Sequence, residues 1–189
     1  MAIDPATHLD DLAATAARAA TVLRPQIAEA ARRTVDTLRN GGTIFFCGNG
    51  GSAADAQHMA AEYVVRYRKN RQALRSIALT TDTSVLTAHA NDFGYEAVFS
   101  RQLEALGRAG DLLMIHTTSG TSLNCIHVVR TAKSMGITTI CLTARDGGDM
   151  QTLADLCIIV PTDRTDRAQE IHLNIQHAIC DVVDEEIGV

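Results

Sequence analysis

The sequence lacks the features of a nucleic-acid-binding or membrane protein. Its formal net charge of −5 and pI of about 5.7 leave no basic excess for nucleic acid, and Lys and Arg cluster only in residues 66–71. No apolar run approaches the length of a membrane span, and residues 1–20 carry acidic side chains instead of a basic leader segment. We therefore expect a soluble protein that binds neither nucleic acid nor membrane.

Signs of disulfide bonding are also missing. The five cysteines are an odd number without a C-x-x-C pair, and most of them lie in apolar segments: Cys47, Cys125, Cys141, Cys157 and Cys180. Reduced thiols that pack as small apolar side chains indicate a reducing compartment, so we expect a cytoplasmic protein. With 189 residues, the chain is long enough to fold as one domain without cross-links.

A glycine-rich turn joins the first expected strand to a helix. The apolar run 43–47 predicts a buried strand, and Gly-Asn-Gly-Gly-Ser follows it at residues 48–52. Glycines let the backbone approach a ligand, Ser52 is expected to cap the helix, and the first N–H groups of that helix suit an anion. The spacing fits neither the dinucleotide fingerprint nor the Walker loop, so a phosphate that is not part of a nucleotide is the expected ligand.

His58 and Glu62 stand four residues apart further along the same helix. Both side chains therefore leave one face of the helix, about one turn beyond the expected anion site. This pair can hold a metal ion or move a proton, or it can be an ordinary ion pair on the surface of an amphipathic helix. The two residues alone leave these possibilities open.

Alternating strand and helix patterns predict an α/β fold with a parallel sheet and right-handed crossovers. Further strands are expected at residues 76–80, 112–116, 138–142 and 156–160. Before them, residues 5–40 predict two helices, interrupted at Pro25 and ended by Gly41. These helices are rich in small residues and can pack against copies of themselves or on their own domain. In such a sheet, ligands bind beyond the carboxyl ends of the strands.

A second hydroxyl-rich turn, Thr117–Ser122, follows the strand at 112–116. It can converge with the first turn on one phosphate group without a cation. His116 directly precedes this turn and can shape the pocket. The last helix, expected at 165–187, carries Gln169 and His177, two turns and about 80° apart around the axis. Taken singly, each is an unremarkable residue.

Four segments in one order resemble the phosphoheptose isomerases, which are sedoheptulose 7-phosphate isomerases of the sugar isomerase (SIS) fold. They are Gly48–Glu62, Asn91–Gly94, Thr118–Ser122 and Arg167–His172, and the resemblance runs from about 43 to 183. It implies a three-layer α/β sandwich with a five-stranded parallel sheet in flavodoxin-like order. It also implies a single SIS domain over residues 1–189, with N-terminal helices in 1–40 and the sheet and its flanking helices in 43–189.

The resemblance further implies a homotetramer with active sites at subunit interfaces and one Zn²⁺ per subunit. The metal ligands fall on His58, Glu62, Gln169 and His177. The sugar-phosphate contacts fall on Asn49, Gly50, Gly51, Ser52, Arg66, Asn91, Asp92, Thr117, Thr118, Ser119, Ser122, Asp166 and Gln169. The implied reaction converts sedoheptulose 7-phosphate into D-glycero-D-manno-heptose 7-phosphate through an enediol, with Glu62 as base and His177 as acid. The metal would polarise the carbonyl, and the product would supply heptose for structures such as lipopolysaccharide.

Three departures from the usual family pattern concern the pocket. Thr121 replaces an asparagine, His116 replaces an aliphatic or small residue, and Ala144 replaces a glycine. Because the hydroxyl groups are retained, we still expect phosphate binding, while the length and stereochemistry of the sugar stay open. Two alternatives are an isomerase of another sugar phosphate and a non-catalytic SIS protein that serves as a binding platform, as in relatives that associate with the bacterial replication initiator. The presence of both Glu62 and His177 favours an enzyme.

Overall fold

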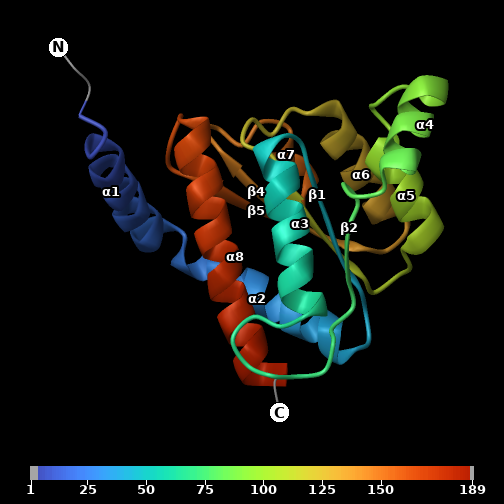
Figure 1. Ribbon diagram of the computed structural model, residues 1–189, viewed down its shortest axis with the longest axis horizontal. Coiled ribbons are helices and arrows are strands. Elements are labelled where there is room, and N and C mark those ends of the chain that lie inside the picture. Colours follow the sequence, from blue (N-terminus) through green and yellow to red (C-terminus); the bar gives the residue numbers. More distant parts are fainter. Residues whose placement is uncertain (1–3, 188–189) are drawn as a thin grey trace.

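The computed structural model describes residues 4–187, and over that range the chain forms a three-layer α/β sandwich (Figure 1). Its five parallel strands are β1 (Ile44–Gly48), β2 (Ser76–Ala78), β3 (Leu112–His116), β4 (Thr138–Ala144) and β5 (Leu156–Val160). They lie in the order β2-β1-β3-β4-β5, with Phe45 of β1 opposite Ile77 on one side and Leu113 on the other. This flavodoxin-like order confirms the predicted fold.

Helices cover both faces of the sheet (Figure 1). They are α1 (Thr7–Val22), α2 (Arg24–Arg39), α3 (Gly51–Val64), α4 (Thr83–Phe93), α5 (Val98–Leu106), α6 (Leu123–Ser134), α7 (Met150–Leu153) and α8 (Thr165–Ile187). As predicted, Pro25 lies in the first turn of α2, where its missing N–H has no partner to lose. Gly41 follows the end of that helix with a φ of 72°, which also agrees with the prediction.

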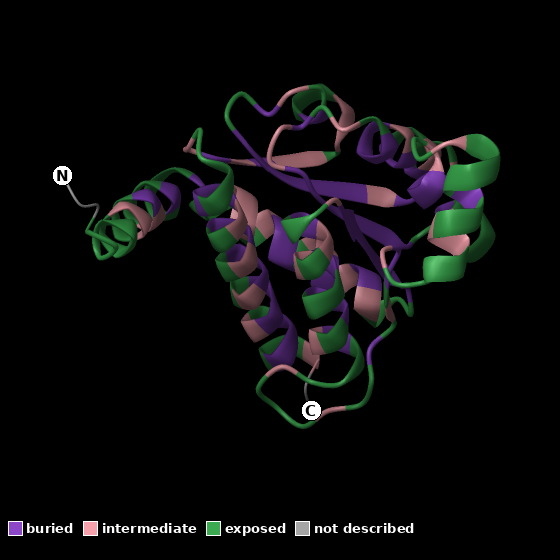
Figure 2. Ribbon diagram, turned by 45° about the horizontal axis from the view of Figure 1, so that its top comes forward, coloured by how far each residue is buried: buried purple, intermediate pink, exposed green. Residues whose placement is uncertain are grey.

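The core has two halves, one on each face of the sheet. Ile44 and Phe46 of β1 pack with side chains from α2, α3 and α8, whereas Phe45 and Cys47 pack with side chains from α5 and α6. All residues of β1 and β3 are buried, as expected for central strands covered on both faces (Figure 2). The sheet therefore holds α3 and α8 side by side on one face.

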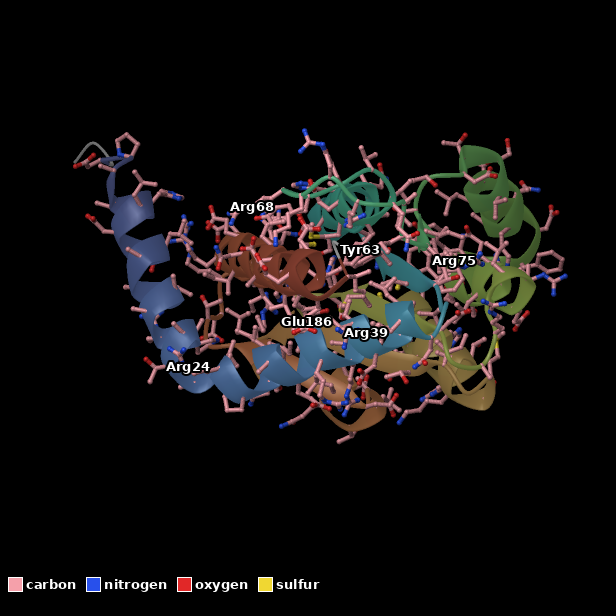
Figure 3. All side chains as sticks on the ribbon, turned by 90° about the horizontal axis from the view of Figure 1, so that it is seen from below. Arg24, Arg39, Tyr63, Arg68, Arg75 and Glu186 are labelled. Carbon is pink, nitrogen blue, oxygen red and sulfur yellow. The ribbon has the colours of Figure 1, made fainter. Side chains whose placement is uncertain are left out.

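The two N-terminal helices contact the rest of the same chain. Helix α2 packs against α8 and β5, and Arg39 near its end forms an ion pair with Glu186 of α8 (Figure 3). Helix α1 contacts α8 and otherwise extends away from the body of the domain, with most of its surface exposed (Figures 1 and 2). Both helices therefore contact their own domain, while packing against copies of the chain stays a prediction.

Some local predictions were wrong. Ser52 does not cap α3, because Gly50 occupies the cap position with a φ of 57° and places Ser52 inside the first turn, where it is buried. Helix α4 runs through Asn91 and Asp92 to Phe93. Within residues 4–187 no helix has the length and apolar character needed to cross a membrane. The five cysteines are free, and all except Cys157 are buried.

Candidate functional site

A cavity of about 280 Å³ opens between the carboxyl ends of β1 and β3. These strands are adjacent in the sheet, and the chain leaves them in opposite directions, toward β2 and toward β4. In flavodoxin-like sheets, this switch in strand order is where ligands bind. The cavity is lined by Asn49, Gly50, Gly51, Ser52, His116, Thr117, Thr118, Ser119, Ser122, Thr165 and Gln169. Both predicted turns therefore meet in one pocket, which we call the anion pocket.

Three helices start at the anion pocket. Gly50 caps α3, Ser122 caps α6, and Thr165 is the first residue of α8. The N-terminus of a helix carries a partial positive charge and N–H groups without intrahelical acceptors. The lining contains no lysine or arginine, so these helix ends and the hydroxyl groups supply the attraction for an anion.

Glycines give the pocket its shape. Gly120 has a φ of 69°, and a Cβ on it would lie 2.0 Å from the carbonyl oxygen of Gly147, so the turn after β3 rests directly on the turn after β4. At Gly51, a Cβ would lie 2.7 to 2.9 Å from the amide group of Gln169, so α8 touches the first turn of α3 here. A side chain at Gly120 would push these two turns apart, whereas a side chain at Gly51 would displace only the end of the Gln169 side chain.

Asn49 is held by a reciprocal amide pair. Its Nδ2 donates to Oδ1 of Asn124 at 2.9 Å, and Nδ2 of Asn124 donates to Oδ1 of Asn49 at 2.8 Å. Asn124 lies in the first turn of α6, so the pair ties the turn after β1 to that helix. Both turns of the anion pocket are thereby fixed to the same element, since Ser122 caps α6.

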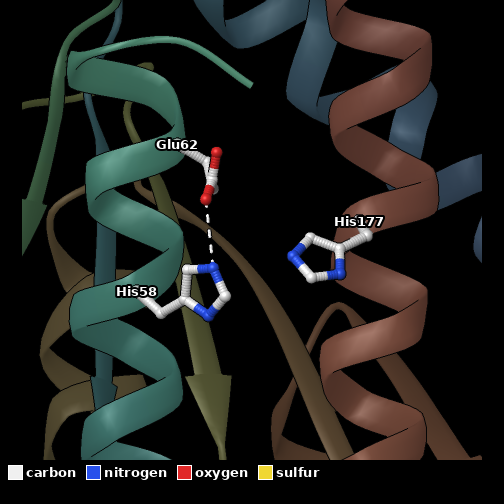
Figure 4. A group of neighbouring side chains, drawn as sticks. All are labelled: His58, Glu62 and His177. Carbon is white, nitrogen blue, oxygen red and sulfur yellow. Dashed lines mark hydrogen bonds and ion pairs between the residues drawn. The ribbon is translucent and has the colours of Figure 1, made fainter. Parts of the chain in front are cut away.

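A second group of predicted site residues lies on facing sides of α3 and α8. His58 and Glu62 project from α3 and His177 from α8, and their ligand atoms all lie within 4.8 Å of one another (Figure 4). Nε2 of His58 is 3.0 Å from Oε1 of Glu62. We call these residues the His–Glu–His cluster. Two imidazoles and one carboxylate form a donor set that can hold a metal ion.

Burial is the main cause that lowers the pKa of His177 below its usual value. The neighbouring His58 acts in the same direction, while Glu62 acts against it. A lowered pKa keeps the imidazole neutral near pH 7, and a neutral imidazole has one nitrogen that can bind a metal or accept a proton and one N–H group that can donate a proton.

Buried histidines support the floor of the anion pocket. His116, at the end of β3, is fully buried, and its Nε2 lies 2.9 Å from Nε2 of Gln176 on α8. The ring of His172 stacks near that of His116, with centroids 6.2 Å apart, and its Nε2 lies 3.0 Å from the carbonyl oxygen of Thr143. His116, one of the three departures from the family pattern, therefore forms a neutral internal contact between the sheet and α8. It is also part of the pocket lining.

The remaining predicted site residues lie outside the anion pocket of a single chain. Arg66 is exposed beyond the end of α3, and Asn91 and Asp92 are exposed near the end of α4, where their side chains hydrogen-bond to each other. Asp166 forms an ion pair with Arg164. Within one chain, these four predicted contacts are not gathered with the nine that line the pocket.

Several residues that the structure brings to the site were not predicted from the sequence. Thr165 lines the anion pocket, and its signal was available, because it is a hydroxyl residue at the expected start of a helix that follows a strand. Asn124, Tyr67 and Gln176 act through contacts between separate elements. No spacing rule within one segment could have identified them.

Comparison with known proteins agrees with this geometry. A family model described as SIS domain matches residues 7–144. The phosphoheptose isomerase of Akkermansia muciniphila is 53% identical over 161 residues, which cover 85% of this chain and 85% of that protein. The phosphoheptose isomerase of Paramagnetospirillum magneticum is 52% identical over 179 residues, which cover 95% and 91% of the two chains.

A solved structure has the same fold over nearly its whole length. The structure of phosphoheptose isomerase GmhA from Neisseria gonorrhoeae matches with a TM-score of 0.91 and 44% identity, covering 95% of this chain and 96% of that one. A sequence identity of 44% over nearly the whole of both chains shows a shared family as well as a shared fold. The chain belongs to the phosphoheptose isomerase family of SIS-domain proteins.

Proposed function

We propose that the protein is an aldose–ketose isomerase that converts D-sedoheptulose 7-phosphate into D-glycero-D-manno-heptose 7-phosphate. One observation carries the proposal: an anion pocket without cations lies beside a His–Glu–His cluster, and α3 and α8 contribute to both. The anion pocket suits the phosphate group of the substrate, and the His–Glu–His cluster suits proton transfer at the other end of the substrate. The names of the relatives compared above agree with this proposal.

The spacing of the two groups suits a long sugar. Gly51, at the anion pocket, precedes His58 by seven residues and Glu62 by eleven on α3. This corresponds to about 10 to 17 Å along the helix axis, and the side chains lean back toward the helix N-terminus. An extended heptulose phosphate places C1 about 10 Å from phosphorus at ordinary bond lengths. A triose phosphate is too short to reach both groups.

The His–Glu–His cluster fits a zinc ion by the chemistry of its donors. Two imidazoles and a carboxylate are the protein ligands of known catalytic zinc sites, which leave further positions open. His58, Glu62 and His177 would hold the metal, and we assign a fourth contact to Gln169, which lies two turns before His177 on α8. When bound, the metal supplies Lewis-acid polarisation of the substrate carbonyl.

The protein's own groups move the protons. Glu62 accepts the proton from C1 of the ketose while His177 donates a proton to the carbonyl oxygen on C2, which gives a neutral enediol. Glu62 then returns its proton to C2, and His177 takes the proton of the C1 hydroxyl as the aldehyde forms. A carboxylate bound to a metal would be a weaker base, and Glu62 is the residue of the cluster that would serve both as ligand and as base.

We assign the phosphate to the lining of the anion pocket and the sugar hydroxyls to the exposed residues. The phosphate contacts are Asn49, Gly50, Gly51, Ser52, Thr117, Thr118, Ser119, Ser122 and Gln169, and the outer contacts are Arg66, Asn91, Asp92 and Asp166. In this proposal the outer contacts reach the substrate only in a homotetramer with sites at its interfaces. The exposed Phe93, next to Asn91 and Asp92, supports an interface there because 76% of its surface is uncovered.

We also propose that the whole chain is one SIS domain, since α2 contributes to the same core as α3 and α8. The free cysteines support a cytoplasmic location, where thiols stay reduced. The product would be a heptose precursor for polysaccharides such as lipopolysaccharide.

The test is a panel of ketose phosphates of three, six and seven carbons, assayed with and without a chelator. We expect turnover of sedoheptulose 7-phosphate, loss of that turnover after chelation, and recovery with added Zn²⁺. If the protein prefers a six-carbon ketose phosphate, sedoheptulose 7-phosphate is not its substrate and the proposal is wrong on this point. No turnover of any member would favour a non-catalytic binding protein.

A further inference from the structure

The segment between α3 and β2, residues 65–75, crosses over to α8 before it returns to the sheet (Figure 1). We call this segment the strap. Its backbone is tied to one carboxylate, because Oδ2 of Asp184 accepts hydrogen bonds from the N–H groups of Arg68 at 2.8 Å and Lys69 at 2.9 Å. Oδ1 of Asp184 accepts from Nε of Arg71 at 2.9 Å. The strap is therefore anchored to α8 at one buried point.

Arg71 extends this anchor to the end of α3. Its side chain and that of Asp184 are each 2% exposed, and the guanidinium also donates to the carbonyl oxygens of Glu62 at 2.7 Å and Tyr63 at 2.8 Å. Carbonyls in the last turn of a helix lack intrahelical partners, so the guanidinium completes the end of α3. One buried ion pair thus joins the helix that carries Glu62 to the helix that carries His177.

The anchored strap places the ring of Tyr67 against His177 of the His–Glu–His cluster. The ring of Tyr67 stacks on the imidazole of His177, with centroids 5.3 Å apart and planes 14° apart. The guanidinium carbon of Arg68 also lies over the Tyr67 ring, 5.0 Å from its centroid, and Nη1 of Arg68 donates to Asp181 of α8 at 2.8 Å. The Tyr67 ring therefore contacts both α8, through His177, and a side chain of the strap that is itself hydrogen-bonded to α8.

His177 has aromatic neighbours in two directions. Besides the stacked ring of Tyr67, the ring of His58 meets it edge-on, with centroids 5.2 Å apart and planes 70° apart. The imidazole of an otherwise free histidine turns about two side-chain bonds, and a stacked ring on one face restricts that rotation. Figure 4 shows His177 turned toward Glu62 and His58, and the stack with Tyr67 is present in this same orientation.

We propose that Tyr67 is a positioning residue, whose ring fixes the imidazole plane of His177 for proton transfer and for metal binding. The proposal rests on the proposed function for the proton-transfer part only. The aromatic ring of Tyr67, and not its hydroxyl group, performs this role, because the stacking contact is made by the face of the ring. Tyr67 is not a catalytic residue, since its contact is with His177.

The test compares Tyr67→Phe, which keeps the ring, with Tyr67→Leu, which removes it. Gln72→Leu, at an exposed strap position, is the matched control. We expect Tyr67→Leu to lower kcat roughly 10- to 100-fold with little change in KM, because the phosphate contacts are untouched. Tyr67→Phe and the control should stay within about twofold of the wild type, because in both the ring contact with His177 remains.

Zinc affinity, measured by competition with a chromogenic chelator, is the second readout. Tyr67→Leu should weaken the zinc affinity at least about tenfold, as expected when a residue that orients a metal ligand is lost. Tyr67→Phe should keep the zinc affinity of the wild type. Tyr67→Met replaces Tyr67→Leu if circular dichroism shows that the latter is unfolded. Equal zinc affinity and equal kcat in the Phe and Leu variants would overturn the proposal, as would equal losses in both. If the wild type binds zinc but isomerises no ketose phosphate, the proposed function fails, and zinc affinity still decides the role of Tyr67.

Discussion

Mild acid should destabilise this protein through two histidines buried beneath the anion pocket. Burial is the main cause that lowers the pKa of His116 to about 3, with the nearby His172 adding to it and the backbone of Ser52 acting against it. Burial likewise lowers the pKa of His172 to about 4, opposed by its hydrogen bond to the backbone of Thr143. In the unfolded chain, both imidazoles return to an ordinary pKa of about 6.5.

The sign and size of the effect follow from proton linkage. The folded state keeps both imidazoles neutral between pH 7 and 5, while the unfolded state takes up protons below about pH 6.5. Full stability is therefore present above that pH and is lost as the pH falls toward the folded pKa values. Between pH 7 and 5 the loss is about 2 kcal/mol for each histidine and about 4 kcal/mol for the two together.

Urea unfolding at pH 8, 7 and 5, with a chelator and at one protein concentration, measures this loss. The variant His116→Leu/Gln176→Leu removes one histidine together with its partner, so that no unpaired amide is left in the core. Its loss between pH 7 and 5 should be smaller than that of the wild type by about 2 kcal/mol. Between pH 8 and 7, the two proteins should change alike. Equal losses in wild type and variant between pH 7 and 5 would refute the reasoning.

Two further predictions concern stability and are measured by urea unfolding at pH 7. Gly120→Ala combines a positive φ of 69° with a Cβ 2.0 Å from the carbonyl oxygen of Gly147, so it should cost about 3 kcal/mol. Gly41→Ala has a similar φ of 72° but no heavy atom within 4 Å, so it should cost about 1 kcal/mol, and equal costs would contradict the packing argument. Asp184→Asn breaks the buried ion pair with Arg71 and should cost about 3 kcal/mol. A cost below about 1 kcal/mol, the range of an exposed pair, would show that the pair is not buried in solution.

Much of the fold could be predicted because the pattern of apolar residues follows the layers. The last strand, Leu156–Val160, and the last helix, Thr165–Ile187, have the predicted bounds, because the turn residues 161–164 separate an apolar run from a helical pattern. Helix α7, with four residues, is too short to show a helical period, and it was not predicted. Strand β2 ends at Ala78, two residues earlier than predicted, on the edge of the sheet where one neighbour is missing.

The site was predictable where one segment carries the whole signal. The glycine turn and the His58/Glu62 spacing each lie within fifteen residues, and the structure brings both to α3. The cap at Gly50 was not predicted, because Ser52 has the more usual capping side chain and only the backbone conformation decides between them. The contact of Tyr67 with His177 joins segments far apart in sequence, so it follows from the packing of the strap on α8.

The most direct test of the central claim is the rate at which Glu62→Gln, loaded with Zn²⁺, converts sedoheptulose 7-phosphate, followed by proton NMR. The substitution keeps the shape of the side chain and removes its basicity. The wild type should form the aldose phosphate, and the variant should turn over roughly 10²- to 10⁴-fold more slowly while remaining folded. A variant with near-normal kcat would contradict the assignment of Glu62 as the base that moves the proton between C1 and C2.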